Sequence, residues 1–164
     1  MNLVDDRTAE DVERALALAK KAEAGTLTDA EKTEWLAGMK GCYNATDMNR
    51  VSTAVQTLAV ELNAAGYAVE IMPQSFAETD IVRLSQWRQY LANVQALRDA
   101  YYTLAETGQL PDAADRLDYA GANTIEKILA DIDLLIGWMK SSYRRCGTFR
   151  AGNNAAHLPL KGSA

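Results

Sequence analysis

Apolar residues recur at three- and four-residue steps in three long stretches of the chain. This spacing places them on one face of a helix and predicts three amphipathic helices with a buried stripe each. The three stripes are Val51, Ala54, Val55, Leu58 and Leu62; Tyr90, Leu91, Val94, Leu97, Tyr101 and Leu104; and Ile125, Ile128, Leu129, Ile132, Leu135, Ile136 and Met139. Polar positions fill the other faces, as expected for helices packed around one core.

Helix start and stop signals set the limits of these elements. Asn44 and Asp47 precede the first stripe, and Gly66 follows it as a residue that takes the left-handed conformation without steric cost. The second helix is expected to begin between residues 80 and 85 and to be ended by Gly108 and Pro111. The third is expected to begin near residues 119–123 and to stop at Gly147.

Two shorter helices are predicted upstream, because two pairs of residues have capping-box spacing. The pairs are Thr8 with Asp11 and Thr28 with Glu31. The first short helix is expected to stop at Gly25 and the second near Gly41.

The order of these elements predicts an all-α protein, with amphipathic helices packed in a bundle of two helical lobes. Residues 1–66 form the expected N-terminal lobe and residues 80–147 the expected C-terminal helical hairpin. Residues 67–72 alternate and then meet Pro73, so we expect residues 67–79 to form a short extended piece and a loop that links the lobes. Residues 148–164 are rich in small and polar side chains, which indicates an extended tail.

Composition and charge exclude several classes of protein. With 48% hydrophobic and 24% charged residues, the chain is typical of globular proteins, and 164 residues are enough to fold without a metal or disulfide. A net charge of −5 argues against nucleic-acid binding, where basic residues supply most of the affinity. We also expect no membrane partner and no signal peptide, because no apolar run reaches about 20 residues and the N-terminus is acidic.

The residues that usually carry chemistry are scattered. His157 is the single histidine and has no carboxylate or cysteine near it in sequence, while Glu126 and Lys127 look like surface charges. Cys42 and Cys146 are expected to be reduced thiols, although a bridge between them stays open. No phosphate-binding glycine loop or HExxH motif is present. We therefore expect no enzyme activity, no cofactor, no metal and no small-molecule substrate.

Aromatic residues and arginines are the best candidates for a functional surface, because both are enriched at protein interfaces. The alternative is that most of them pack within the lobes. The candidate interface residues are Trp35, Tyr43, Arg50, Trp87, Tyr102 and Arg145.

Several blocks of the sequence resemble tail proteins of phages and prophages of Gram-positive bacteria. The resemblance spans most of residues 5–150 and is most specific between residues 35 and 51. The blocks are LTDAEK at 27–32, EWLAGMKG at 34–41, YNATDMNRV at 43–51, LNAAGY at 62–67, YLANV at 90–94, LDY at 117–119 and ANTIE at 122–126.

This resemblance implies a virion structural protein of the tail, such as a baseplate, tail-tip or fibre-adaptor component. Its expected partners are other phage tail proteins and copies of itself, and it would be assembled in the cytoplasm of the host bacterium. The resemblance carries over no catalytic residue. The alternative is a cytoplasmic helical assembly chaperone or regulator that is not incorporated in the particle, since acidic charge and capped helices suit both.

Overall fold

The computed structural model describes residues 1–146, with side chains as far as residue 142, and this part contains five helices and no strand. The helices are α1 (Ala9–Glu23), α2 (Asp29–Leu36), α3 (Ala45–Ala64), α4 (Leu84–Ala100) and α5 (Tyr119–Cys146). The predicted all-α class is therefore confirmed for these residues. The predicted extended tail, residues 148–164, lies outside the described residues, as does His157.

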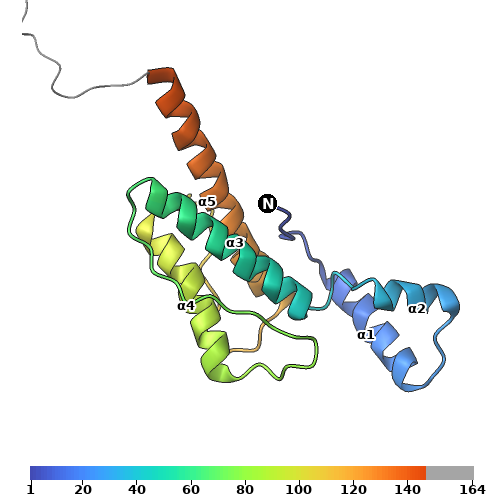
Figure 1. Cartoon of the computed structure of the whole chain (residues 1–164). Helices are drawn as coiled ribbons and strands as arrows, with labels where there is room; N and C mark the ends of the chain where they lie inside the picture. Colours follow the sequence, from blue (N-terminus) through green and yellow to red (C-terminus); the bar gives the residue numbers. More distant parts are fainter. Residues whose placement is uncertain (147–164) are drawn as a thin grey trace, which may run out of the picture.

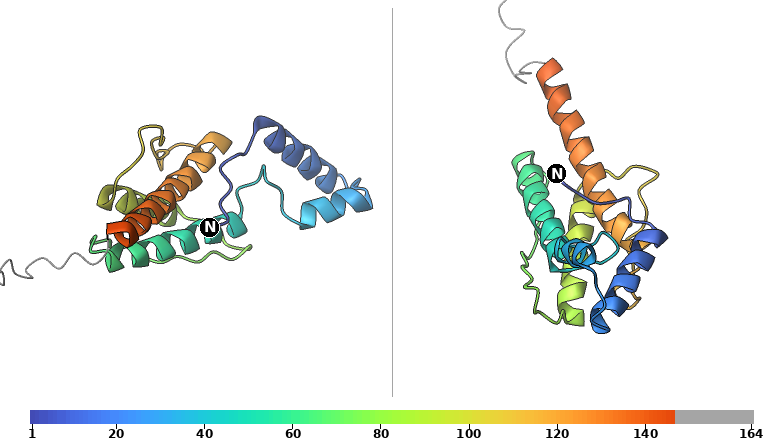
Figure 2. Two further views of the ribbon diagram at one scale, coloured as in Figure 1. Left: turned by 90° about the horizontal axis from the view of Figure 1, so that it is seen from above. Right: turned by 90° about the vertical axis from the view of Figure 1, so that its right-hand side faces the viewer.

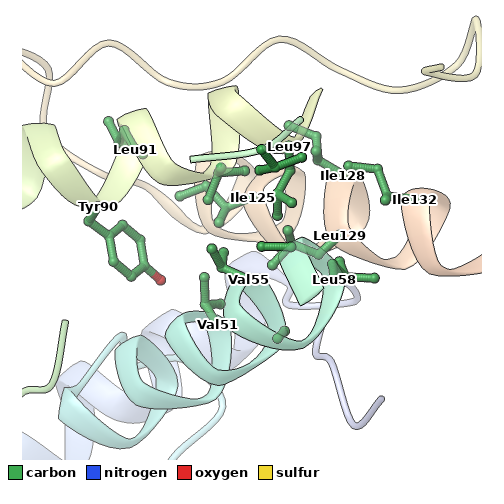
Figure 3. Close-up of a cluster of buried hydrophobic side chains, with 14 of the residues drawn as sticks. Val51, Val55, Leu58, Tyr90, Leu91, Leu97, Ile125, Ile128, Leu129 and Ile132 are labelled. Carbon is green, nitrogen blue, oxygen red and sulfur yellow. The ribbon is translucent and has the colours of Figure 1, made fainter. Parts of the chain in front are cut away.

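The core lies where α3, α4 and α5 pack against one another. Figure 3 shows the three apolar stripes meeting there, with Val51 and Leu58 from α3, Leu97 from α4 and Ile125 from α5. These four side chains are fully buried. Two apolar side chains of the segment between α3 and α4, Val69 and Phe76, complete the same cluster.

Most predicted helix limits are confirmed, because local side-chain hydrogen bonds set them. Thr8, Thr28 and Asn44 are the N-caps of α1, α2 and α3, and each forms a capping box with the residue three positions later. Gly25 and Gly66 have φ of 67° and 93° just beyond α1 and α3.

Two helix ends differ from the prediction. α4 ends at Ala100, so Tyr101 and Leu104 do not continue its stripe. Tyr101 is extended instead, with φ −136° and ψ 173°, and its ring packs edge-on against Tyr67 at 4.8 Å between centroids. α2 ends at Leu36, before Gly38 with φ 87°, and so is shorter than the expected run to Gly41.

The shared core does not follow the division into two lobes that the sequence suggested. α3, assigned to the N-terminal lobe, packs on α4 and α5 of the expected C-terminal hairpin. The remaining pair, α1 and α2, projects to one side of this three-helix body (Figures 1 and 2). We call residues 9–36 the hairpin arm.

Four asparagine side chains hold extended backbone against the helices. Each amide donates to the carbonyl oxygen of one extended residue and accepts from the backbone N–H of the same residue, at 2.7–3.1 Å. The pairs are Asn49 with Phe76, Asn63 with Val69, Asn93 with Met72, and Asn123 with Arg7. We call these contacts asparagine clamps. They replace the partner strand that an extended segment would otherwise need.

Replacing Asn93 with aspartate is expected to lower the free energy of unfolding by about 1–3 kcal/mol. The change removes the donor to Met72 O and places carboxylate oxygen against that carbonyl in a buried site. Urea denaturation followed by circular dichroism measures the loss. Asn2 is exposed, so Asn2→Asp is the matched control and should leave the midpoint unchanged. Equal midpoints for both variants would contradict a stabilising clamp.

Ion pairs join the two helices of the hairpin arm. Arg14 of α1 binds Glu34 of α2 through two hydrogen bonds of 2.7 and 3.1 Å. Lys21 of α1 lies 2.5 Å from the carboxylate of Glu31, which also accepts from the backbone N–H of Thr28. The hydrogen bond from Lys21, with that from Thr28, lowers the pKa of Glu31 from its ordinary value of 4.5 to about 2.

The contact between α1 and α2 within the hairpin arm is therefore expected to loosen as pH falls from about 4.5 towards 2. Because the pKa of Glu31 is lower in the folded chain, its contribution is complete above 4.5 and is lost as the carboxylate is protonated. The nuclear magnetic resonance signal of the Trp35 indole N–H, one turn along α2, reports the change. A Glu31→Gln variant should respond much less in this pH range; an unchanged response would contradict the assignment.

Candidate protein-interaction surface and its buried anchor

Four charged side chains form a network between the start of the chain, α3 and α5. Arg7 lies 3.0 Å from Asp47 and 2.8 Å from Glu126, and Arg50 lies 2.5 Å from Asp47 and 2.7 Å from Glu126. A second bond of 3.1 Å, from Arg50 Nε to Glu126 Oε2, makes the Arg50–Glu126 pair bidentate. We call these four residues the buried charge network. Two positive and two negative charges balance within it.

The position of Glu126 corrects the sequence analysis, which took it for a surface charge. It lies between Ile125 and Ile128 on α5 and has no exposed surface. Its carboxylate also accepts a hydrogen bond of 2.6 Å from the backbone N–H of Val4. A buried carboxylate is stable only when paired, and here the N-terminal segment supplies both an arginine and a backbone donor. Lys127, in contrast, is exposed as expected.

Local sequence explains how the network is assembled. Asp47 completes the capping box of α3, so its carboxylate is already fixed at the start of that helix. Arg50 follows one turn later and faces it at the i, i+3 spacing. Arg7 directly precedes the N-cap Thr8 of α1. The network thus joins the base of the hairpin arm to the three-helix body.

Hydrogen bonds raise the pKa of the Arg50 guanidinium. Burial alone would lower it, but the bonds to Glu126 and Asp47 outweigh that effect. These bonds therefore favour the charged form of Arg50.

Two tyrosines extend the network into the core. The Arg7 guanidinium lies 5.3 Å from the centre of the Tyr43 ring, a cation–π contact. The hydroxyl groups of Tyr43 and Tyr90 are 2.5 Å apart, and the Tyr90 ring stacks on Trp87 at 5.2 Å. Burial is the main cause of a raised pKa for both tyrosines, so both stay protonated. This arrangement holds elements together and offers no nucleophile paired with a base.

The structure distributes the six candidate interface residues over different environments. Tyr43 and Arg50 are engaged inside the chain, as described above, and Trp35 and Trp87 are half-buried. Tyr102 is 78% exposed. The side chain of Arg145 lies outside the described ones. Of the five candidates whose side chains are described, Tyr43 and Trp87 line one groove, which the others do not line.

An apolar groove opens beside Trp87, with a volume of about 590 Å³. Its lining comes from the start of α3, the start of α4 and the loop before α5. The lining residues are Tyr43, Met48, Val82, Leu84, Trp87 and Leu117. Ile81, next to this lining, is 91% exposed. We call this feature the Trp87 groove.

Sequence reasoning missed four of the six groove residues. Val82 and Leu84 precede the amphipathic stripe of α4, and Leu117 lies in a loop, so no periodicity marks them. The sequence marks these residues only as apolar side chains that lie outside the predicted buried stripes. Large apolar residues that stay exposed beside one another mark interaction sites.

Comparison with known proteins identified no similar protein. No protein-family model matches the chain, and no curated protein or solved structure matches it.

Among the described side chains, which end at residue 142, no group of three histidine, cysteine or acidic residues is placed to hold a metal ion. None of the helices in this part is long and apolar enough to cross a membrane. Cys42 is a half-buried free thiol, and burial raises its pKa above the ordinary value, which disfavours the reactive thiolate.

Proposed function

We propose that the chain is a structural protein of a phage tail, as a baseplate, tail-tip or fibre-adaptor component, and that it acts through protein–protein assembly. The resemblance of residues 27–67 to tail proteins supports this proposal. Its mechanism would be binding and geometry, with the three-helix body as a rigid support and the hairpin arm as a contact element.

The observation that carries the proposal is the exposed but well-anchored hairpin arm. α2 buries none of its side chains, and Leu36 at its end is 84% exposed. An element of this kind adds little to the core of its own chain. Yet it is capped, joined to α1 by ion pairs and fixed at its base by the buried charge network. An external element that is held in place by so many interactions is better explained by a role in contacting other molecules than by a role in the core.

Immunogold labelling of purified particles from the source host tests the proposal. Gold at one end of the tail is the expected result. Particles free of label, with the protein left in the lysate, would overturn it in favour of the assembly chaperone or regulator.

A matched pair of variants links the result to the hairpin arm. Leu36→Glu should reduce the amount of protein in particles, because it places a charge on the exposed end of α2. Gln56→Glu adds the same side chain at an exposed position of α3 and should leave incorporation unchanged. Quantitative mass spectrometry of the particles measures both. Equal incorporation would contradict the role of the arm.

A further inference from the structure

We infer that the Trp87 groove is the docking site for the hairpin arm of a second copy of this chain. This inference rests on the proposed assembly function and specifies a second copy of the chain as a binding partner. It follows from the chemistry of the groove, from that of the arm, and from the charges beside each.

The α4 side of the groove is apolar and carries positive charge, whereas the acidic residues Asp80 and Asp118 flank the lining at Val82 and Leu117. Arg83 and Arg88 are exposed beside the groove residues Leu84 and Trp87. Neither has a carboxylate partner among residues 1–146, whereas Arg7, Arg14 and Arg50 all do. No acidic residue occurs between residues 83 and 98. Arginine and tryptophan around an apolar hollow are the residues that contribute most to binding in protein interfaces.

The arm side is acidic and carries an apolar anchor. Residues 9–36 contain seven acidic and four basic side chains. Glu10 and Glu13 lie on one face of α1, are exposed, and have no ion pair among the described residues. Leu36 of the adjacent helix is nearly fully exposed. The arm therefore offers unpaired negative charge on α1 and an exposed aliphatic side chain at the end of α2.

Charge selects this pairing over a contact between two grooves. If two copies met groove to groove, Arg83 and Arg88 would face the same arginines of the partner. Like charges brought together at an interface are unfavourable, whereas arm to groove brings opposite charges together. The hollow of about 590 Å³ is also large enough for more than one side chain.

Charge reversal followed by mixing tests the contact. Sedimentation velocity over a range of concentrations should show reversible self-association of the full-length protein. Arg83→Glu with Arg88→Glu, and separately Glu10→Lys with Glu13→Lys, should each raise the dissociation constant at least about tenfold. An equimolar mixture of the two double variants should associate like the original chain, because each arm then meets a groove of opposite charge.

Controls separate this contact from other causes. Circular dichroism confirms that the variants are folded. Glu70→Lys with Glu106→Lys makes the same change in net charge as Glu10→Lys with Glu13→Lys, but at exposed positions outside arm and groove, and should associate normally. Serine at Phe149, Leu158 and Leu160 should also leave association intact. If this triple serine variant lost association, the inference would be overturned, because residues beyond 146 would then be required for the contact.

The remaining outcomes also decide the question. A protein that stays monomeric at all concentrations, or a mixture that does not recover association, overturns the inference. Particle labelling is independent of both results. If the tail is labelled but the protein is monomeric, the proposed function stands and the docking contact is wrong. If the protein self-associates through the groove but particles carry no label, the contact stands and the proposed function is wrong.

Discussion

Replacing Glu126 with alanine is expected to lower the free energy of unfolding by about 3–5 kcal/mol. Arg7 and Arg50 would then share Asp47 as their one remaining carboxylate, and a positive charge would stay buried without a partner. The backbone N–H of Val4 would lose its acceptor as well. Urea denaturation measures the change.

Two further variants show which property of Glu126 matters. Glu126→Gln keeps the size and an acceptor oxygen but removes the charge, so its loss should be smaller than that of Glu126→Ala. Glu70 is exposed and has no ion pair in the described part of the chain, so Glu70→Ala should stay within about 0.5 kcal/mol of the original. If Glu126→Ala and Glu70→Ala were equally stable, the network would not hold the fold.

Replacing Gly41 with alanine is expected to cost about 3 kcal/mol or to displace the hairpin arm. A Cβ atom at this position would lie 2.0 Å from the carbonyl oxygen of Asp11 and 2.7 Å from the backbone nitrogen of Val12. Both are backbone atoms of α1, so no side-chain rotation relieves the overlap. Hydrogen exchange should become faster in α1 and α2 while α3, α4 and α5 stay protected.

Gly137 offers the matched control. A Cβ there meets nothing within 4 Å, and the residue lies inside α5. Gly137→Ala should therefore raise stability by about 0.5–1 kcal/mol, because alanine loses less backbone entropy in a helix. If Gly41→Ala also left exchange in α1 and α2 unchanged, the close approach of Gly41 to α1 would be unimportant.

Sequence patterns were sufficient for the helices because their causes are local. Capping boxes at Thr8, Thr28 and Asn44 and stripes of buried apolar residues act over three or four positions. The end of α4 was missed because Tyr101 is held by a ring from another element, Tyr67. The periodicity of apolar residues does not reveal that a contact with a distant residue ends the helix.

The candidate surface was harder to predict because it depends on contacts between distant residues. Glutamate is usually a surface residue, and Glu126 is buried here because Arg7, 119 positions earlier, and Arg50, 76 positions earlier, both pair with it. Tyr43 and Trp87 were proposed as interface residues because they are aromatic, but the groove that they line exists only once α3, α4 and the loop before α5 meet. The asparagine clamps also escaped, because asparagine within a helix carries no signal of its own.

The clamps have a consequence for how the chain behaves at high local concentration. In residues 67–72, Tyr67, Val69 and Ile71 alternate with Ala68, Glu70 and Met72, and a largely apolar segment of this kind pairs readily with identical segments of neighbouring chains. Asn63 and Asn93 bind the backbone groups of Val69 and Met72 within this stretch, and Asn49 binds those of Phe76 just beyond it. The three amides therefore occupy backbone groups that an added strand would need, which makes the segment a poorer template for β-aggregation between copies crowded together.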